Sequence, residues 1–91
     1  MKPVVFLGHS RVRLRRFPDG PRGDAGFQLR MVQRGLDPRE WKPMNSIGQG
    51  VREIRVRDST GAFRVIYVAN FAEAIYVPHA FQKKVAKNIA A

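Results

Sequence analysis

The sequence contains no cysteine, which excludes a disulfide framework and any metal site built from thiolates. Its two histidines, His9 and His79, lie far apart in the chain and do not suggest a zinc site. We therefore expect no metal and no other cofactor. The absence of cysteine also fits a protein of the reducing cytoplasm.

Long hydrophobic runs are missing as well. The apolar run near the N-terminus, Val4 to Leu7, is far shorter than the roughly 18 residues that a membrane span needs, and no signal-peptide pattern surrounds it. At 91 residues the chain is also too short to bury a large core or carry a separate cofactor-binding fold. We expect a single domain over residues 1–91, located in the cytoplasm and not bound to membrane.

Acidic residues are scarce. The chain has 7 Asp and Glu against 17 Lys and Arg, which gives a net charge of +10 and a pI near 11.4. The excess is mostly arginine and is present in both halves, so it belongs to the folded domain and not to a basic tail. Because a small domain needs only about 2 to 8 net charges for solubility, the surplus favours a polyanionic partner.

The first half of the chain predicts one strand and two helices. The β-branched run Val4 to Leu7 predicts a strand, and Ser10 is a candidate N-cap for a short basic helix through Phe17. Residues 18–21 have turn chemistry. After them Ala25, Leu29 and Val32 recur at helical spacing, and Gly35 predicts the end of this second helix. Residues 36–43, with two prolines, predict an irregular connection.

The second half changes its period. Residues 51–57 alternate between polar and apolar side chains, 58–61 predict a turn, and residues 62–69 and 74–79 predict two further strands. Residues 83–91 contain enough helix formers for a short C-terminal helix. The predicted fold class is α+β, with an antiparallel twisted sheet and two N-terminal helices packed on one face.

Three arginines form the first candidate site. Arg55 and Arg57 lie two apart on one predicted strand and therefore on one face, and the hairpin places Arg64 beside them. Arginines crowded together are unfavourable unless an anion lies between them, and the guanidinium fork matches phosphate geometry. The structural alternatives are an ion pair of Arg64 with Glu53 and a solvated strand face.

A second candidate cluster follows the last strand. Antiparallel pairing is expected to bring His79, Lys83 and Lys84 near Arg64. His79 can accept or donate a proton near neutral pH, which arginine cannot do, and a lysine can bind phosphate or donate a proton. The alternatives are a hydrogen-bonded histidine at a strand end and solvated lysines.

At these positions the chain resembles the phage-related, HigB-like branch of the RelE/ParE toxin superfamily. The resemblance covers about residues 3–85, and the combination of matching stretches is more specific than any one of them. The stretches are Gln33-Arg34-Gly35-Leu36, Trp41-Lys42-Pro43-Met44, Ile47 to Asp58, Gly61 to Tyr67 and His79 to Lys84.

The resemblance implies a RelE-like fold and the toxin of a type II toxin–antitoxin pair. It implies an endoribonuclease that cleaves mRNA on the translating ribosome by metal-independent attack of the 2′-hydroxyl. The expected partners are that mRNA and a helix-turn-helix antitoxin, through which the toxin could form oligomers. The expected catalytic residues are Arg64, His79 and Lys83 or Lys84, and the expected phosphate-binding residues are Arg52, Arg55 and Arg57.

Two other functions fit the same sequence. A ParE-like inhibitor would bind DNA gyrase and cut no nucleic acid itself, although the three arginines fit this function less well. A catalytically inactive homologue would bind nucleic acid only.

The position of Pro78 is unusual for the resemblance, because proline cannot donate a backbone hydrogen bond within a sheet.

Overall fold

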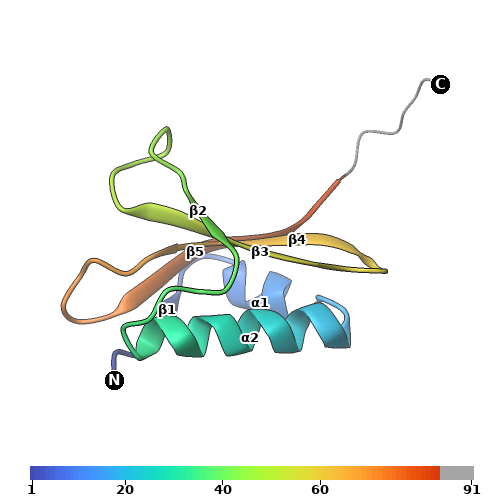
Figure 1. The fold of residues 1–91 in the computed structure, drawn as a ribbon, viewed down its shortest axis with the longest axis horizontal. Helices are drawn as coiled ribbons and strands as arrows, with labels where there is room; N and C mark the ends of the chain where they lie inside the picture. The colour runs from blue at the N-terminus through green and yellow to red at the C-terminus, as the bar shows by residue number, and fades with distance from the viewer. Residues whose placement is uncertain (85–91) are drawn as a thin grey trace.

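The computed structural model describes residues 1–84, which form two helices and five strands around a single sheet (Figure 1). In chain order these are β1 (Val4–Phe6), α1 (Ser10–Arg15), α2 (Asp19–Gln33), β2 (Trp41–Pro43), β3 (Val51–Asp58), β4 (Gly61–Val68) and β5 (Ile75–Lys83). No helix in this range is long and apolar enough to span a membrane.

The sheet is mixed, so the prediction of an antiparallel sheet is wrong. The strand order is β1-β5-β4-β3-β2, and β1 runs parallel to β5 while the other neighbours are antiparallel. A short apolar run such as Val4 to Leu7 indicates a strand but not its direction. The direction depends on a partner about 70 residues away in the chain, with every other element inserted between them.

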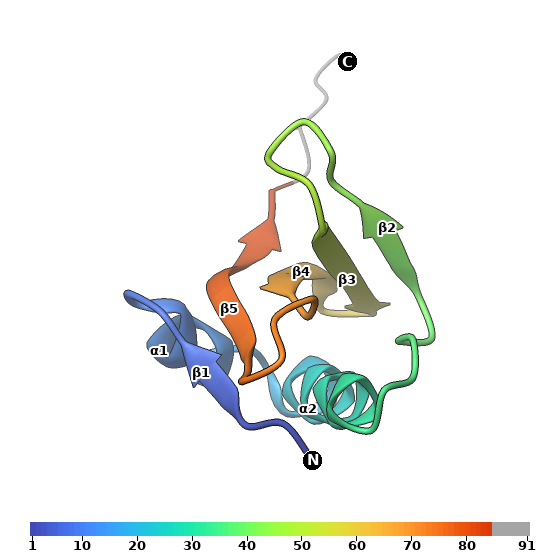
Figure 2. The same ribbon diagram turned by 90° about the vertical axis from the view of Figure 1, so that its left-hand side faces the viewer.

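The prediction of two N-terminal helices packed on one face of the sheet is also wrong. Strands dominate the structure, and the helices are unequal: α1 has 6 residues and contacts β5, whereas α2 has 15 and contacts β3. In Figure 2, α2 lies below β3 and β4, while α1 lies beside β1 and β5. Ser10 does not cap α1. Its Oγ donates a hydrogen bond to the Val77 carbonyl at 2.7 Å and so ties α1 to β5.

The second helix begins earlier than its sequence suggests. Residues 18–21 predict a turn, but Pro18 is the N-cap of α2 and Pro21 lies in its first turn, where no backbone N–H is needed. The helix ends at Gln33, and Gly35 follows it as the expected stop, with a φ of +82°. Gly35 N donates to Val32 O at 2.9 Å and Leu36 N to Met31 O at 3.0 Å, the pair of bonds typical of a glycine-terminated helix.

Three other boundaries differ from the predictions. Residues 41–43 form the edge strand β2, and the β3–β4 hairpin has a loop of only two residues, Ser59 and Thr60. Strand β5 continues past His79 to Lys83, so Lys83 does not begin a helix. The remainder of the predicted C-terminal helix, residues 85–91, lies outside the described residues.

Pro78 lies within β5. The register between β4 and β5 shifts between Ile66 and Val68, which pair with His79 and Tyr76 respectively. The irregularity therefore spans Pro78. A regular strand pairing would need a backbone N–H donor at this position, and proline has none.

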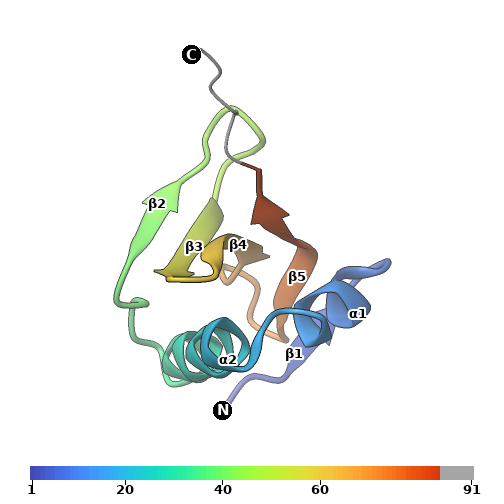
Figure 3. The ribbon, with the colours of Figure 1, turned by 90° about the vertical axis from the view of Figure 1, so that its right-hand side faces the viewer.

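The core lies between the sheet and the helices. Phe63, Val65 and Tyr67 alternate along β4 and are buried on the helix side, and the Phe63 ring packs against Phe17 with centroids 4.8 Å apart. Arg64 lies between them in sequence and therefore points to the opposite face. We call this opposite face the outer face. On this side β2 and the end of β5 rise on either side of β3 and β4 (Figure 2 and Figure 3).

Candidate functional site

The β3–β4 hairpin places two arginines directly opposite one another. Arg55 and Arg64 are register partners, so their side chains leave the same face of the sheet. The two-residue turn fixes this register. The Asp58 carboxylate accepts hydrogen bonds from Thr60 N at 2.7 Å and Thr60 Oγ1 at 2.5 Å, and these bonds lower the pKa of Asp58.

A buried carboxylate lies between the arginines. Glu53 is 6% exposed, and its Oε1 is 3.1 Å from Nε of Arg55 and 3.6 Å from Nε of Arg64. The ion pair between Glu53 and Arg64 that the sequence offered as a structural alternative is therefore present. One carboxylate shared by two guanidiniums leaves them with a net positive charge.

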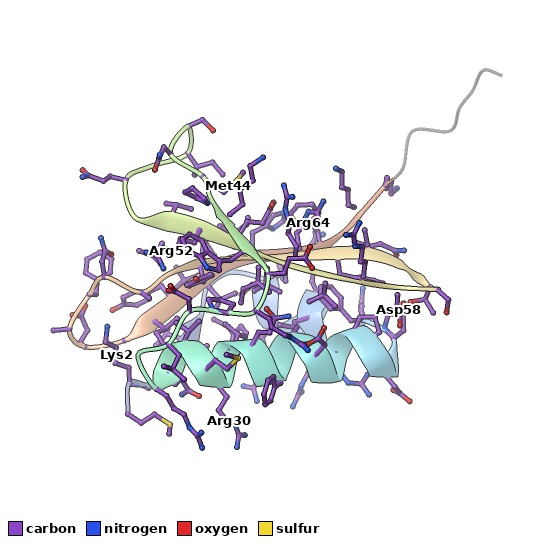
Figure 4. All side chains as sticks on the ribbon, viewed as in Figure 1. Lys2, Arg30, Met44, Arg52, Asp58 and Arg64 are labelled. Carbon is purple, nitrogen blue, oxygen red and sulfur yellow. The ribbon has the colours of Figure 1, made fainter. Side chains whose placement is uncertain are left out.

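These residues line a small pocket on the outer face, with a volume of about 240 Å³. Its lining comes from β2, β3, β4 and β5 and consists of Lys42, Met44, Glu53, Arg55, Arg64, Phe81 and Lys83. We call Lys42, Arg55, Arg64 and Lys83, with Glu53, the sheet-face cluster. Four cationic side chains surround one carboxylate, so the pocket attracts an anion. Figure 4 shows Arg64 and Met44 on the side of the sheet away from α2.

The structure separates the three residues of the second cluster. Lys83 lies on the outer face and lines the pocket with Arg64. His79 is exposed and stacks on the Phe81 ring with centroids 4.8 Å apart, but it does not line the pocket. Lys84 borders a different hollow, of about 570 Å³, between α1 and β5.

Arg57 and Arg52 also lie apart from the cluster. Arg57 is largely exposed and faces Glu40 at 3.7 Å, beside a hollow that borders α2. Arg52 pairs in register with Tyr67, so its side chain projects from the helix side of the sheet. Residues an odd number apart on a strand point to opposite faces, so the spacing from Arg52 to Arg55 was the signal that separates them.

Two residues of the pocket were not predicted as site residues. Lys42 lies in register with Glu53 through β2, a strand that the proline-containing sequence did not predict. Phe81 lies in register with Arg64, and its ring borders the pocket. Beyond the pocket, Arg13 of α1 and Arg16, the C-cap of that helix, line the hollow that Lys84 borders. They extend the basic surface around the end of β5.

Comparison with known proteins identifies the family. The model of the family described as "Phage derived protein Gp49-like (DUF891)" matches residues 13–89, which include the last residues of α1, all of α2 and strands β2 to β5. No curated protein and no solved structure matches the chain. The chain belongs to the phage-derived Gp49-like family, which is associated with RelE-like toxins of toxin–antitoxin pairs and hence with an antitoxin partner.

Proposed function

We propose that this protein is the toxin of a type II toxin–antitoxin pair and an endoribonuclease of the RelE and HigB type, which cleaves mRNA on the translating ribosome. The observation that carries the proposal is the sheet-face cluster. Arg55 and Arg64 face one another, Lys42 and Lys83 complete the rim, and the pocket has the size and charge to receive one phosphate group of an RNA strand.

The proposed reaction needs no metal ion. The 2′-oxygen of one nucleotide attacks the adjacent phosphorus as the bond from phosphorus to the 5′-oxygen breaks. The products are a 2′,3′-cyclic phosphate and a 5′-hydroxyl. Negative charge grows on the phosphoryl oxygens during this step, and the guanidiniums of Arg64 and Arg55 are fixed donors that stabilise it. Glu53 holds both in position through Oε1.

The reaction also moves two protons. One leaves the 2′-hydroxyl and one reaches the departing 5′-oxygen. Among residues 1–84, Glu53 is the only carboxylate that lines the pocket, and it contacts the arginines through Oε1. We assign the acceptor role to Oε2 of Glu53 and the donor role to Lys83. His79, one register step from Phe81 on the same face, contacts the RNA beside the cleaved bond.

The decisive experiment is an mRNA cleavage assay in a translating extract with purified Arg64→Ala protein. Loss of a transition-state donor should reduce the cleavage rate by about 100-fold or more. The matched control is Arg30→Ala. Arg30 is exposed and lies on the side of α2 away from the sheet (Figure 4), so this change removes the same charge without touching the pocket. Circular dichroism of both variants verifies that they are folded.

Other outcomes would point to another function. Intact mRNA with the wild-type protein would overturn the proposal, and gyrase-dependent DNA breaks with normal translation would indicate a ParE-like inhibitor. Glu53→Gln separates proton transfer from binding. It should abolish mRNA cleavage, while ribosome binding is retained. A variant that still cleaves would leave Glu53 with a structural role only.

A further inference from the structure

A further pocket lies on the helix side of the sheet, near the N-terminus. It has a volume of about 500 Å³ and lies between the end of α2, the N-terminus and the first residues of β3. We call it the end pocket. It is lined by Met1, Lys2, Val32, Gln33, Arg34, Gly35, Leu36, Asp37, Gly50, Arg52, Tyr67, Ala69 and Asn70. None of the proposed chemistry on the outer face uses it.

Tyr67 is the unusual residue of the end pocket. Its side chain is completely buried, yet among residues 1–84 its hydroxyl has no hydrogen-bond partner. Buried polar groups are nearly always paired, and one without a partner costs about 1 to 3 kcal/mol. Burial raises the pKa of Tyr67, and the nearby Arg52 guanidinium acts in the opposite direction without forming a hydrogen bond of ordinary geometry. Because the net shift is upward, the hydroxyl keeps its proton at neutral pH and can donate it to an acceptor.

The guanidinium of Arg52 is a cation close to this hydroxyl, and Trp41 and Asp37 fix its position. Its guanidinium lies over the Trp41 ring, 4.2 Å from the centroid, and its Nη1 donates to Oδ1 of Asp37 at 3.0 Å. Asp37 is well exposed and uses only one of the five guanidinium donors. Lys2 and Arg34 also line the pocket, so three cations face one carboxylate.

Hydrogen bonds of Lys2, a close backbone approach at Gly50 and three apolar side chains shape the walls of the end pocket. The Lys2 ammonium donates to the carbonyls of Ala69 and Phe71, both at 2.7 Å, and thereby holds the N-terminal segment beside the β4–β5 loop. Gly50 has a φ of +82°, and a Cβ at that position would lie 2.5 Å from the side chain of Asn70. Met1, Val32 and Leu36 supply apolar wall beside these polar groups.

We propose that the end pocket binds a carboxylate group, with the Tyr67 hydroxyl and the Arg52 guanidinium donating hydrogen bonds to its oxygens. The apolar wall accommodates the short aliphatic stem that carries the carboxylate. The group comes either from a small organic acid or from an acidic side chain of a bound peptide. This site is separate from the sheet-face cluster and does not depend on the function proposed for that cluster.

The experiment is an NMR titration of the full chain with two probes. The first probe is succinate, and the second is the peptide acetyl-Leu-Glu-Leu-amide, with acetyl-Leu-Gln-Leu-amide as its uncharged control. The expected result is saturable shifts of the Arg52 Nε–H and of the Gly50 and Asn70 amides with a carboxylate probe and none with the glutamine peptide. Response to succinate alone indicates a small acid, and response to the Glu peptide indicates a peptide partner. Absence of response to both carboxylates overturns the proposal.

Two tyrosine variants make the test specific. Tyr67→Phe removes the unpaired hydroxyl, so the melting temperature should stay the same or rise, while affinity for the responding probe should fall about tenfold or more. Tyr76→Phe is the control, because its hydroxyl donates to Glu73 at 3.0 Å away from the pocket, and it should leave the affinity unchanged. Unchanged affinity in Tyr67→Phe, or a lower melting temperature in that variant, would contradict the proposed role of the hydroxyl.

Discussion

The sheet-face cluster and the end pocket contain the same residue types but differ in how far these residues are exposed to solvent. Each surrounds one carboxylate with cations, and both draw an arginine from β3. In the sheet-face cluster the side chains of Glu53 and Arg64 are only 8% and 11% exposed, whereas those of Asp37 and Arg52 at the end pocket are 63% and 39% exposed. Charges removed from water interact more strongly, which fits the catalysis proposed for the first cluster and the reversible binding proposed for the second.

The largest expected difference between the two regions is in catalysis. Arg64→Ala should reduce mRNA cleavage by about 100-fold, because it removes a donor to the phosphate. Arg52→Ala should change the cleavage rate by less than about threefold, because the Arg52 side chain projects from the helix side of the sheet and not from the outer face. Cleavage rates of the two variants in one translating extract provide the comparison. Equal losses would show that the face of β3 is irrelevant to the activity.

The next difference is in stability. Glu53→Gln leaves Arg64 and Arg55 without their shared carboxylate and should lower the free energy of unfolding by about 2 kcal/mol. This is less than for a fully buried pair, because Arg55 is partly exposed. Asp37→Asn breaks an exposed pair and should cost less than about 1 kcal/mol. Urea unfolding of both variants measures the two values. A larger cost for Asp37→Asn would reverse the comparison.

A smaller difference concerns the salt dependence of RNA binding. Lys83→Ala removes one phosphate contact and should reduce the slope of log affinity against log salt concentration by about 0.7. Arg34→Ala removes a cation of the end pocket and should leave the slope unchanged. Filter binding of a single-stranded RNA at several salt concentrations tests both. A lower slope in Arg34→Ala would extend the RNA path to the helix side.

The smallest effect is expected at the hairpin turn, which fixes the register of the strands that carry both regions. Hydrogen bonds from Thr60 lower the pKa of Asp58. A lowered pKa stabilises the fold above the usual pKa of the group, and this contribution disappears as the pH falls through the lowered value. Asp58→Ala should therefore have a slightly lower melting temperature than wild type at pH 7. Melting curves down to pH 2 should show the two proteins converge.

The candidate site was predictable where it depends on neighbours in sequence. The alternation along β3, the turn at 58–61 and the apolar strand around Arg64 predict that Arg55 and Arg64 meet, because side-chain direction in a strand follows a period of two. The same period separates Arg52 from Arg55. Lys42 was not predictable in this way, since its place beside Glu53 depends on β2 joining the sheet edge.

The fold shows the same division. Local chemistry determined the end of α2 at Gly35 and the hairpin between β3 and β4, because a left-handed glycine and a tight turn involve only adjacent residues. Tertiary structure alone decided that β1 runs parallel to β5 and that β5 continues to Lys83, whose side chain lies on the outer face. These features depend on which distant segments bury the same apolar surface, and no local pattern specifies that pairing.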